Sequence, residues 1–303
     1  MRLQDALVFK SRIMRQIFFL STEHLENCLW FKDDEDFKVG MNFAAIQAAS
    51  DPDVKVLAFI LMSNHVHFVL WGWKQDAESF INQLKRRYSV YYQAKYGGRE
   101  LLRRNKVDIK PIPDEDEARE KAIAYVQMNC VAANICSHPT QYPWGSGSVF
   151  FNPTPQGGRK LGAFSKRVLR KMLHTDAYTL PKDWMICEEA YILPSNYVAV
   201  KTVEAVFRTP KRMNFFLANS SKAKKRLESG EKSLPAFRDQ VILACLPDLC
   251  RTLFGKESFK QLLKEEQAEL LKQLRFRFSV DANQMARVCG LTYEEAARLL
   301  DSL

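Results

Sequence analysis

Two histidines, His65 and His67, follow an apolar run over residues 56–61 and the turn-prone pair Ser63-Asn64. Alternate side chains of a β-strand point to the same face, so the two imidazoles would lie side by side and could bind one divalent metal ion. The alternative is ordinary, because two histidines spaced this way in a strand are more often half-buried or solvated. The metal interpretation therefore depends on which other ligands and nucleophiles the chain offers.

Tyr125 and Asn129 are the next pair that could do chemistry. They are four residues apart in a predicted helix, so their side chains would project from one face. The amide oxygen of Asn129 could be a third protein ligand to a metal ion on His65 and His67, with water and a phosphate oxygen completing the shell. The phenol of Tyr125 could then attack a phosphorus atom one helical turn away. The alternative for this pair is a half-buried aromatic and a surface amide.

Other tyrosines compete with Tyr125 as the nucleophile. They lie on the preceding helix and are Tyr88, Tyr91 and Tyr92. None of them has a neighbour that resembles Asn129. Tyr88 falls on the same helical stripe as Phe80 and Leu84, so it is interpreted as a core residue.

Three segments, in this order, resemble the single-tyrosine transposases of the HUH endonuclease superfamily, especially the REP-associated tyrosine transposases. They are residues 61–70 (LMSNHVHFVL), 125–133 (YVQMNCVAA) and 142–146 (YPWGS). The family's first motif is His, a bulky apolar residue, His, and its helix motif is typically Tyr-Ile-x-x-Asn-Pro-Val-x-Ala. The resemblance covers roughly residues 16–150.

The resemblance implies a set of roles and a reaction. Tyr125 would be the nucleophile, and His65, His67 and Asn129 would bind Mg²⁺ or Mn²⁺. The tyrosine would attack a phosphate of DNA, leaving a covalent 5′-phosphotyrosine and a free 3′-hydroxyl that can reverse the step. The metal would stabilise the charge that develops in both directions. The partner would be single-stranded or hairpin DNA, and the sequence leaves open whether the chain acts alone or as a homodimer.

Basic and aromatic side chains would bind that DNA, because phosphates pair with cations and bases stack on rings. The expected contacts are Lys85, Arg86, Arg87, Tyr91, Tyr92, Arg103 and Arg104. The net charge of +10 is uneven: residues 1–150 carry 19 Lys and Arg against 18 Asp and Glu, and residues 151–303 carry 26 against 17. Residues 159–226, with 15 basic and five acidic side chains, either attract phosphate backbones or form a solvated surface.

The elements that must position these residues alternate between strand and helix. Strands are expected at residues 16–22, 54–62, 65–73 and 106–112, and helices at residues 34–49, 76–95 and 114–134. This order predicts an α+β fold, a ferredoxin-like antiparallel sheet with helices on one face. The His pair would then face outward on an open second face.

The Pro/Gly-rich stretch at residues 152–158 is the best domain boundary. Residues 1–155 would form the nuclease domain, and residues 156–303 a basic, mainly helical accessory region that binds DNA. Within residues 282–300, Ala286 and Gly290 are four apart, which is typical of either a helix-turn-helix or an ordinary helical hairpin.

The seven cysteines are odd in number and include no Cys-x-x-Cys pair, which argues against a disulfide framework and a structural zinc site. With no signal-peptide core and no bilayer-length apolar run, we expect a cytoplasmic, nucleoid-associated protein and no membrane partner. Two rival functions stay open. One is a transposase-derived DNA-binding regulator without strand transfer. The other, a metal hydrolase of small phosphate esters, is less favoured because it needs neither the tyrosine nor the basic stretch.

Overall fold

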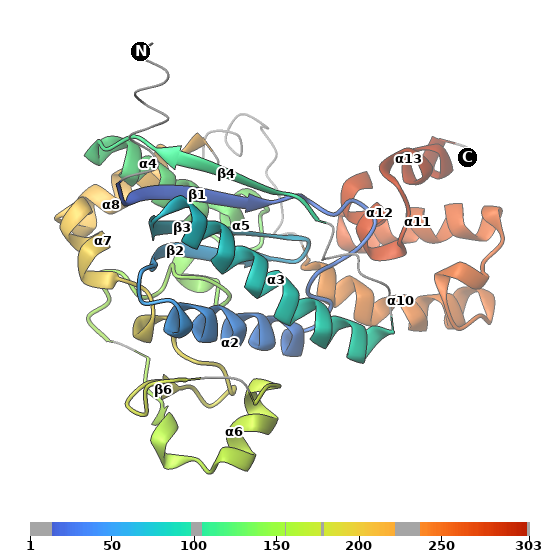
Figure 1. The fold of residues 1–303 in the computed structure, drawn as a ribbon. Coiled ribbons are helices and arrows are strands. Elements are labelled where there is room, and N and C mark those ends of the chain that lie inside the picture. The colour runs from blue at the N-terminus through green and yellow to red at the C-terminus, as the bar shows by residue number, and fades with distance from the viewer. Residues whose placement is uncertain (1–13, 98–104, 155, 177–178, 222–236, 302–303) are drawn as a thin grey trace.

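The computed structural model describes residues 14–97, 105–154, 156–176, 179–221 and 237–301 of the 303-residue chain. A four-stranded antiparallel sheet in the order β2-β3-β1-β4 lies at its centre (Figure 1). The strands are β1 (Gln16–Thr22), β2 (Lys55–Met62), β3 (His65–Gly72) and β4 (Val107–Ile112). With α2 (Asp34–Ser50) after β1 and α3 (Lys74–Tyr96) after β3, the predicted α+β fold is confirmed, and its strand order is ferredoxin-like.

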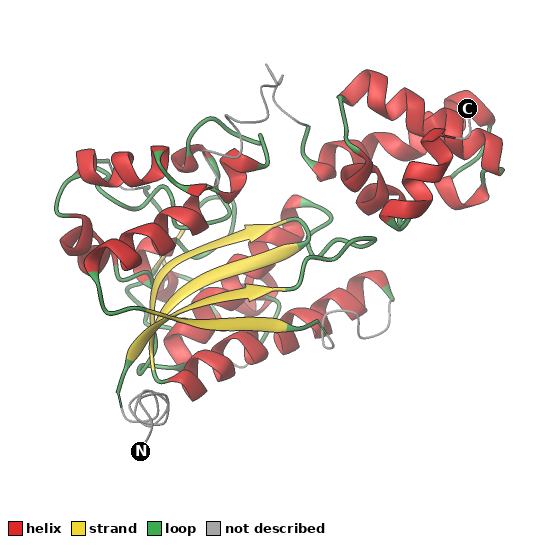
Figure 2. Ribbon diagram, turned by 90° about the horizontal axis from the view of Figure 1, so that it is seen from above, coloured by secondary structure: helices red, strands yellow, loops and turns green. Residues whose placement is uncertain are grey.

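The first face of the sheet packs on the two crossover helices, which cross beneath the strands in Figure 2. Phe68 of β3 lies on this face, and its ring centroid is 5.3 Å from that of Phe80 in α3. The helix α3 ends at Gly97, whose left-handed backbone (φ 68°) is a conformation that glycine adopts without strain.

The second face of the sheet carries the histidines, and the prediction that it is open is wrong. The helices α4 (Asp116–Gln127) and α5 (Asn129–Ala132) pack on this face. The ring of Tyr125 in α4 meets both Phe19 of β1 and His67 of β3. His65 and His67 are therefore only 5% and 2% exposed, not outward-facing. Sequence alternation along β3 could not show this, because the covering helix comes from a segment far along the chain.

The helix predicted over residues 114–134 is interrupted at Met128, between Tyr125 and Asn129. The side-chain nitrogen of Asn129 donates to the carbonyl oxygens of Tyr125 (2.8 Å) and Val126 (3.2 Å). A side chain that bonds to nearby carbonyls competes with the helical backbone ladder, which explains the local break.

Residues beyond the predicted boundary at 155 continue the packing of the sheet. They include β5 (Arg159–Lys160), α6 (Lys166–Leu173), β6 (Met185–Ile186), α7 (Val200–Phe207) and α8 (Pro210–Ala218). Val198 pairs with Val56 at the outer edge of β2, and Arg212 of α8 forms an ion pair with the fully buried Glu120 of α4. One hydrophobic core thus extends from Phe18 to Leu217. The division at residue 155 stays a prediction about function.

The prediction of a mainly helical C-terminal region is confirmed, and the helices from residue 239 onward have their own hydrophobic core. We call this bundle the C-terminal domain; it comprises α10 (Asp239–Phe254), α11 (Lys264–Phe278), α12 (Ala282–Cys289) and α13 (Tyr293–Asp301). The turn between α12 and α13 is at Gly290 (φ 71°), and Ala286 and Ala296 are fully buried where the helices cross. Each helix in the described ranges is too short or too polar to cross a membrane.

Candidate functional site

Three imidazoles meet at the second face of the sheet, at the end where β3 begins. His65 and His67 lie on β3, with ring centroids 4.7 Å apart. The third is His24, in the loop after β1, whose ring stacks on that of His65 with a centroid distance of 3.6 Å. One potential ligand atom from each histidine lies within 4.8 Å of the others. Three neutral imidazoles at this separation can hold one divalent metal ion.

Strand pairing explains why His24 reaches this place. β1 runs antiparallel to β3 with Ser21 opposite His67, so the chain that leaves β1 passes over His65. Hydrogen bonds anchor it on both sides of His24. The backbone N–H of Val66 donates to Thr22 Oγ1 (2.9 Å) on one side, and Leu25 is bonded to Asn64 on the other.

Asn64 connects the His24 loop to the ring of His65. Its backbone oxygen accepts from Leu25 N (3.2 Å), and its side-chain nitrogen donates to Leu25 O (2.8 Å). The remaining amide atom, Oδ1, lies 2.8 Å from His65 Nδ1. An amide oxygen only accepts, so we assign the proton of this contact to Nδ1, which makes Nε2 the metal-binding nitrogen.

Tyr125 lies next to the cluster, and its role as the nucleophile stays a prediction. Its half-buried ring has its centroid 5.9 Å from that of His67, at a steep angle. Phe19 packs against both rings, stacked on His67 at 5.4 Å and edge-on to Tyr125 at 5.5 Å. The phenol is therefore held beside the imidazoles by a fixed aromatic neighbour.

Asn129 is buried, and its side chain is fixed by the two hydrogen bonds to the carbonyl oxygens of Tyr125 and Val126. Because those bonds use the amide nitrogen, Oδ1 is the atom that could serve as a ligand. Its role as a metal ligand stays a prediction. His24 is the histidine that sequence reasoning missed; its only local signal is a position two residues after a predicted strand.

The edge of the sheet next to the site carries a cation. Lys110 of β4 is paired with Phe19, so it lies on the same face as the cluster, and its side chain is 69% exposed. Its ion pair with Asp108 (2.6 Å) raises the pKa of the Lys110 ammonium. Asp108 lies opposite Ser21 in the pairing of β4 with β1, and Ser21 lies opposite His67 in the pairing of β1 with β3.

The competing tyrosines lie on α3, across the sheet from the histidines. Burial raises the pKa of Tyr88 well above its usual value, and its hydroxyl donates to Trp30 O (2.6 Å). Burial also raises the pKa of Tyr91, which donates to the fully buried Asp36, and the pKa of Tyr92, which lies 3.6 Å from Cys28 Sγ. A raised pKa disfavours the phenolate, so none of the three is placed or activated for attack beside the cluster.

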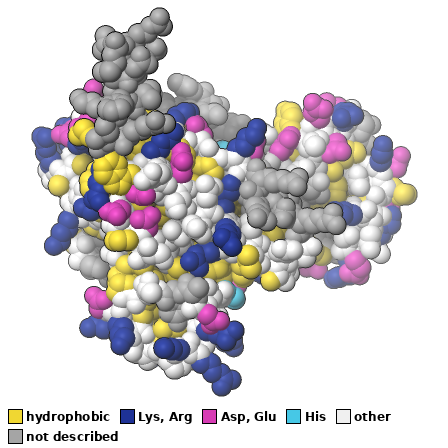
Figure 3. All heavy atoms as spheres, viewed as in Figure 1, with side chains coloured by type: hydrophobic (Ala, Val, Ile, Leu, Met, Phe, Trp, Pro, Cys, Tyr) yellow, Lys and Arg dark blue, Asp and Glu magenta, His cyan; other side chains and the backbone are white. Residues whose placement is uncertain are grey.

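The predicted DNA contacts are not gathered in one place. Lys85 is buried and its ammonium donates to Asn105 O, while Arg103 and Arg104 lie outside the described residues. Arg86 and Arg87 line a cleft of about 520 Å³ with Tyr91 and with His174, the residue after α6. Lys and Arg side chains also gather around the projection formed by α6 and β6 (Figure 3).

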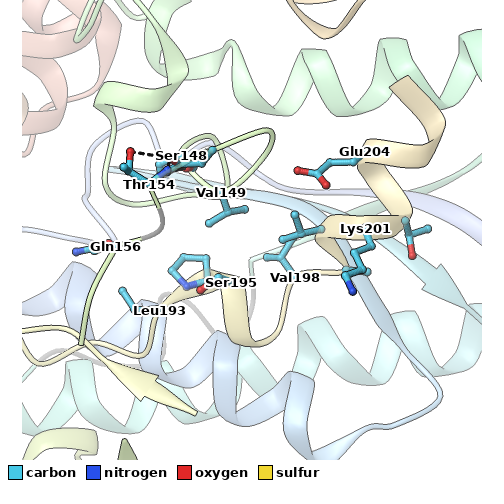
Figure 4. A pocket seen from close by; sticks show the side chains of 14 residues that line it. Ser148, Val149, Thr154, Gln156, Leu193, Ser195, Val198, Lys201 and Glu204 are labelled. Atoms are coloured by element: carbon cyan, nitrogen blue, oxygen red, sulfur yellow. Dashed lines mark hydrogen bonds between the residues drawn. The ribbon is translucent and has the colours of Figure 1, made fainter. Parts of the chain in front are cut away.

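A second hollow, of about 590 Å³, lies between residues 148–156 and residues 193–204 (Figure 4). It is lined by hydroxyls such as Ser148 and Ser195 and by the charged Lys201 and Glu204. It adjoins the start of β2, whereas the histidines adjoin its end, about 20 Å away at the usual rise per residue of a strand. This hollow is therefore separate from the histidine cluster.

Comparison with known proteins gives limited matches. The family of peptidase inhibitors I36 matches residues 28–101, less than half of the chain. Among solved structures, the chain is similar to one described as "Structure of the REP associates tyrosine transposase bound to a REP hairpin". That likeness has 13% sequence identity and a TM-score of 0.32, and covers 43% of this chain and 75% of the other. No curated protein matches.

Proposed function

We propose that this chain cleaves and rejoins single-stranded DNA through a covalent 5′-phosphotyrosine on Tyr125, with a divalent metal ion bound beside it. The placement of the Tyr125 ring against His67, in a cluster of three imidazoles, carries the proposal. Tyrosine and His-x-His come from segments far apart in sequence, and the fold brings them to one face of the sheet. The proposed site needs both the tyrosine and the pair of histidines.

The metal would be held by His65 and His67, with His24 as a third imidazole and Asn129 Oδ1 as the predicted oxygen ligand. The donor set fits a metal, because the ligand atoms of the three histidines lie within 4.8 Å of one another and Asn64 orients the ring of His65. When bound, a divalent ion neutralises the charge on a phosphate oxygen during displacement. Nitrogen donors favour transition-metal ions such as Mn²⁺ or Co²⁺ over Mg²⁺, which prefers oxygen.

The reaction is an exchange of one phosphate ester for another. The phenolic oxygen of Tyr125 forms a bond to phosphorus, the bond from phosphorus to the 3′-oxygen breaks, and the 3′-oxygen takes up a proton as the phenol loses one. One phosphate ester replaces another without hydrolysis, so the reaction is reversible and the 3′-hydroxyl can attack the phosphotyrosine and reseal the strand. Lys110 lies on the same face and can pair with a phosphate beside the reacting one.

The DNA would extend beyond the histidine cluster. Arg86 and Arg87 are the predicted contacts whose side chains line a cleft with His174, and that arrangement supports a role in binding phosphates. The sequence motifs leave open whether the bound strand is unpaired throughout or folded into a hairpin. Hairpin and single-stranded oligonucleotides are therefore both suitable substrates to test.

The testing experiment is a denaturing gel after incubation of the protein with oligonucleotides of randomised sequence and Mn²⁺. DNA labelled at its 3′ end should migrate with the protein, and DNA labelled at its 5′ end should be released as a shorter strand. This polarity follows from a 5′-phosphotyrosine. A chain that binds the DNA and forms no adduct with either label would instead favour the regulator.

A further inference from the structure

The loop that carries His24 lies between the histidine cluster and the C-terminal domain. We call residues 23–33 the metal-site loop. Figure 1 shows it passing beside α12 before the chain returns to α2. The backbone N–H of Tyr293 donates to Glu26 Oε1 (2.7 Å), and Gln240 Nε2 donates to Phe31 O (2.8 Å). The domain therefore contacts this loop near both of its ends.

Asp239 is at the centre of this junction. It is the first residue of α10, it is 4% exposed, and its carboxylate accepts from donors on both sides of the junction. Ser63 Oγ donates to it at 2.6 Å, Gln284 Nε2 at 2.9 Å and Arg287 Nε at 3.2 Å. A buried carboxylate is stable only when it is paired in this way, so the contact with Ser63 belongs to a satisfied network and is not an incidental surface bond.

Ser63 connects that network to the candidate metal ligands. Its backbone oxygen accepts from Trp30 N (2.8 Å) and Phe31 N (3.1 Å), which ties the far end of the metal-site loop to the β2–β3 turn. The next residue, Asn64, bonds Leu25 beside His24 and orients the ring of His65. The chain of contacts thus runs from Asp239 through Ser63 and Asn64 to both His24 and His65.

We propose that Asp239 is a positioning residue for the metal site, through which the docked C-terminal domain fixes His24 and His65 in their ligand geometry. The inference rests on the proposed metal site and goes beyond it, because it assigns the domain a role in metal affinity. Partners that orient metal-binding histidines typically change metal affinity by about 10- to 100-fold when removed. A carboxylate acting at this distance through a serine should lie near the lower value.

The test is a titration of the full chain with Co²⁺, monitored by calorimetry and by the visible absorption of the bound ion. Ser63→Ala removes one donor and leaves Asp239 paired with Arg287 and Gln284, so the fold should persist. We expect the Co²⁺ Kd to rise about tenfold with an altered spectrum. Ser63→Thr keeps the hydroxyl and should restore both, and Asp239→Asn should resemble Ser63→Ala. Asp248→Asn, at an exposed ion pair of the same helix, is the matched control.

A Co²⁺ Kd within about twofold of the wild-type value for both Ser63→Ala and Asp239→Asn, with unchanged spectra, would overturn the proposal, because removing an orienting partner should cost more than that. So would equal losses in Ser63→Ala and Ser63→Thr, because they would point to packing instead of the hydrogen bond. If His65→Ala leaves wild-type Co²⁺ binding unchanged, the metal site and this inference both fail. If the wild-type chain binds Co²⁺ and Ser63→Ala weakens that binding, the inference about Asp239 stands. If no DNA adduct forms in that case, only the proposed DNA cleavage is refuted.

Discussion

The imidazole of His24 stacks on the imidazole of His65 at a centroid distance of 3.6 Å, although His24 lies in the loop after β1 and His65 is the first residue of β3. The contact depends on the antiparallel pairing of β1 with β3 and on the two bonds between Leu25 and Asn64. It adds a third nitrogen to the His-x-His pair. Metal affinity should therefore depend on all three rings.

Replacing His24 with Ala should weaken Mn²⁺ or Co²⁺ binding by more than about tenfold, because it removes one of the three candidate imidazole ligands. His24 is exposed in its loop, so the free energy of unfolding should change little. Calorimetry with the metal measures the first effect, and thermal unfolding measures the second. His174→Ala removes an exposed histidine that pairs with Glu35 away from the cluster, and it should leave metal binding unchanged.

Removal of the metal with excess chelator should abolish strand cleavage and leave the secondary structure intact. Mn²⁺ should restore cleavage at a lower concentration than Mg²⁺, since the histidines supply nitrogen ligands. The rate of cleavage against the concentration of each ion gives the comparison. Full activity in excess chelator would contradict metal-dependent cleavage, and a lower concentration requirement for Mg²⁺ than for Mn²⁺ would contradict a shell dominated by nitrogen ligands.

Replacing Arg86 and Arg87 together with Gln should lower the affinity for single-stranded DNA. The slope of log affinity against log salt should also become shallower, by about 0.7 for each phosphate that the variant no longer neutralises. Fluorescence anisotropy at several salt concentrations measures both. Arg251→Gln is a control, because Arg251 already pairs with Asp248 and Glu257 in the C-terminal domain. An unchanged salt slope in the double variant would place the DNA elsewhere.

The strands and the position of His65 and His67 could be predicted from sequence because their signals are local. The apolar run of β2, the turn and the alternation along β3 are all contained in one short segment. His24 could not be found in this way, since it lies in a loop with no pattern of its own. Its proximity to His65 follows from β1–β3 pairing, which is a property of the whole sheet.

Burial of the histidine face could not be predicted for a related reason, because it depends on a segment far along the chain. Nothing in β3 indicates that α4 returns to cover that face, and the ring of Tyr125 supplies part of the cover. The break at Met128 arises from a bond between the side chain of Asn129 and its own helix, which the spacing of Tyr125 and Asn129 does not reveal. Similarly, the Pro/Gly-rich stretch at 152–158 marks a loop, yet the core continues past it to Leu217.

The most direct test of the proposed function is the identity of the residue that becomes linked to DNA. Replacing Tyr125 with Phe removes one oxygen and little volume, so metal and DNA binding should persist while the covalent adduct disappears. Tyr293→Phe, at an exposed position in the C-terminal domain, is the matched control and should form the adduct at the wild-type level. Mass spectrometry of peptides from the trapped wild-type adduct should locate the phosphate on Tyr125. A modified peptide that contains Tyr88, Tyr91 or Tyr92 instead, or an adduct that persists in Tyr125→Phe, would contradict the assignment of Tyr125 as the nucleophile.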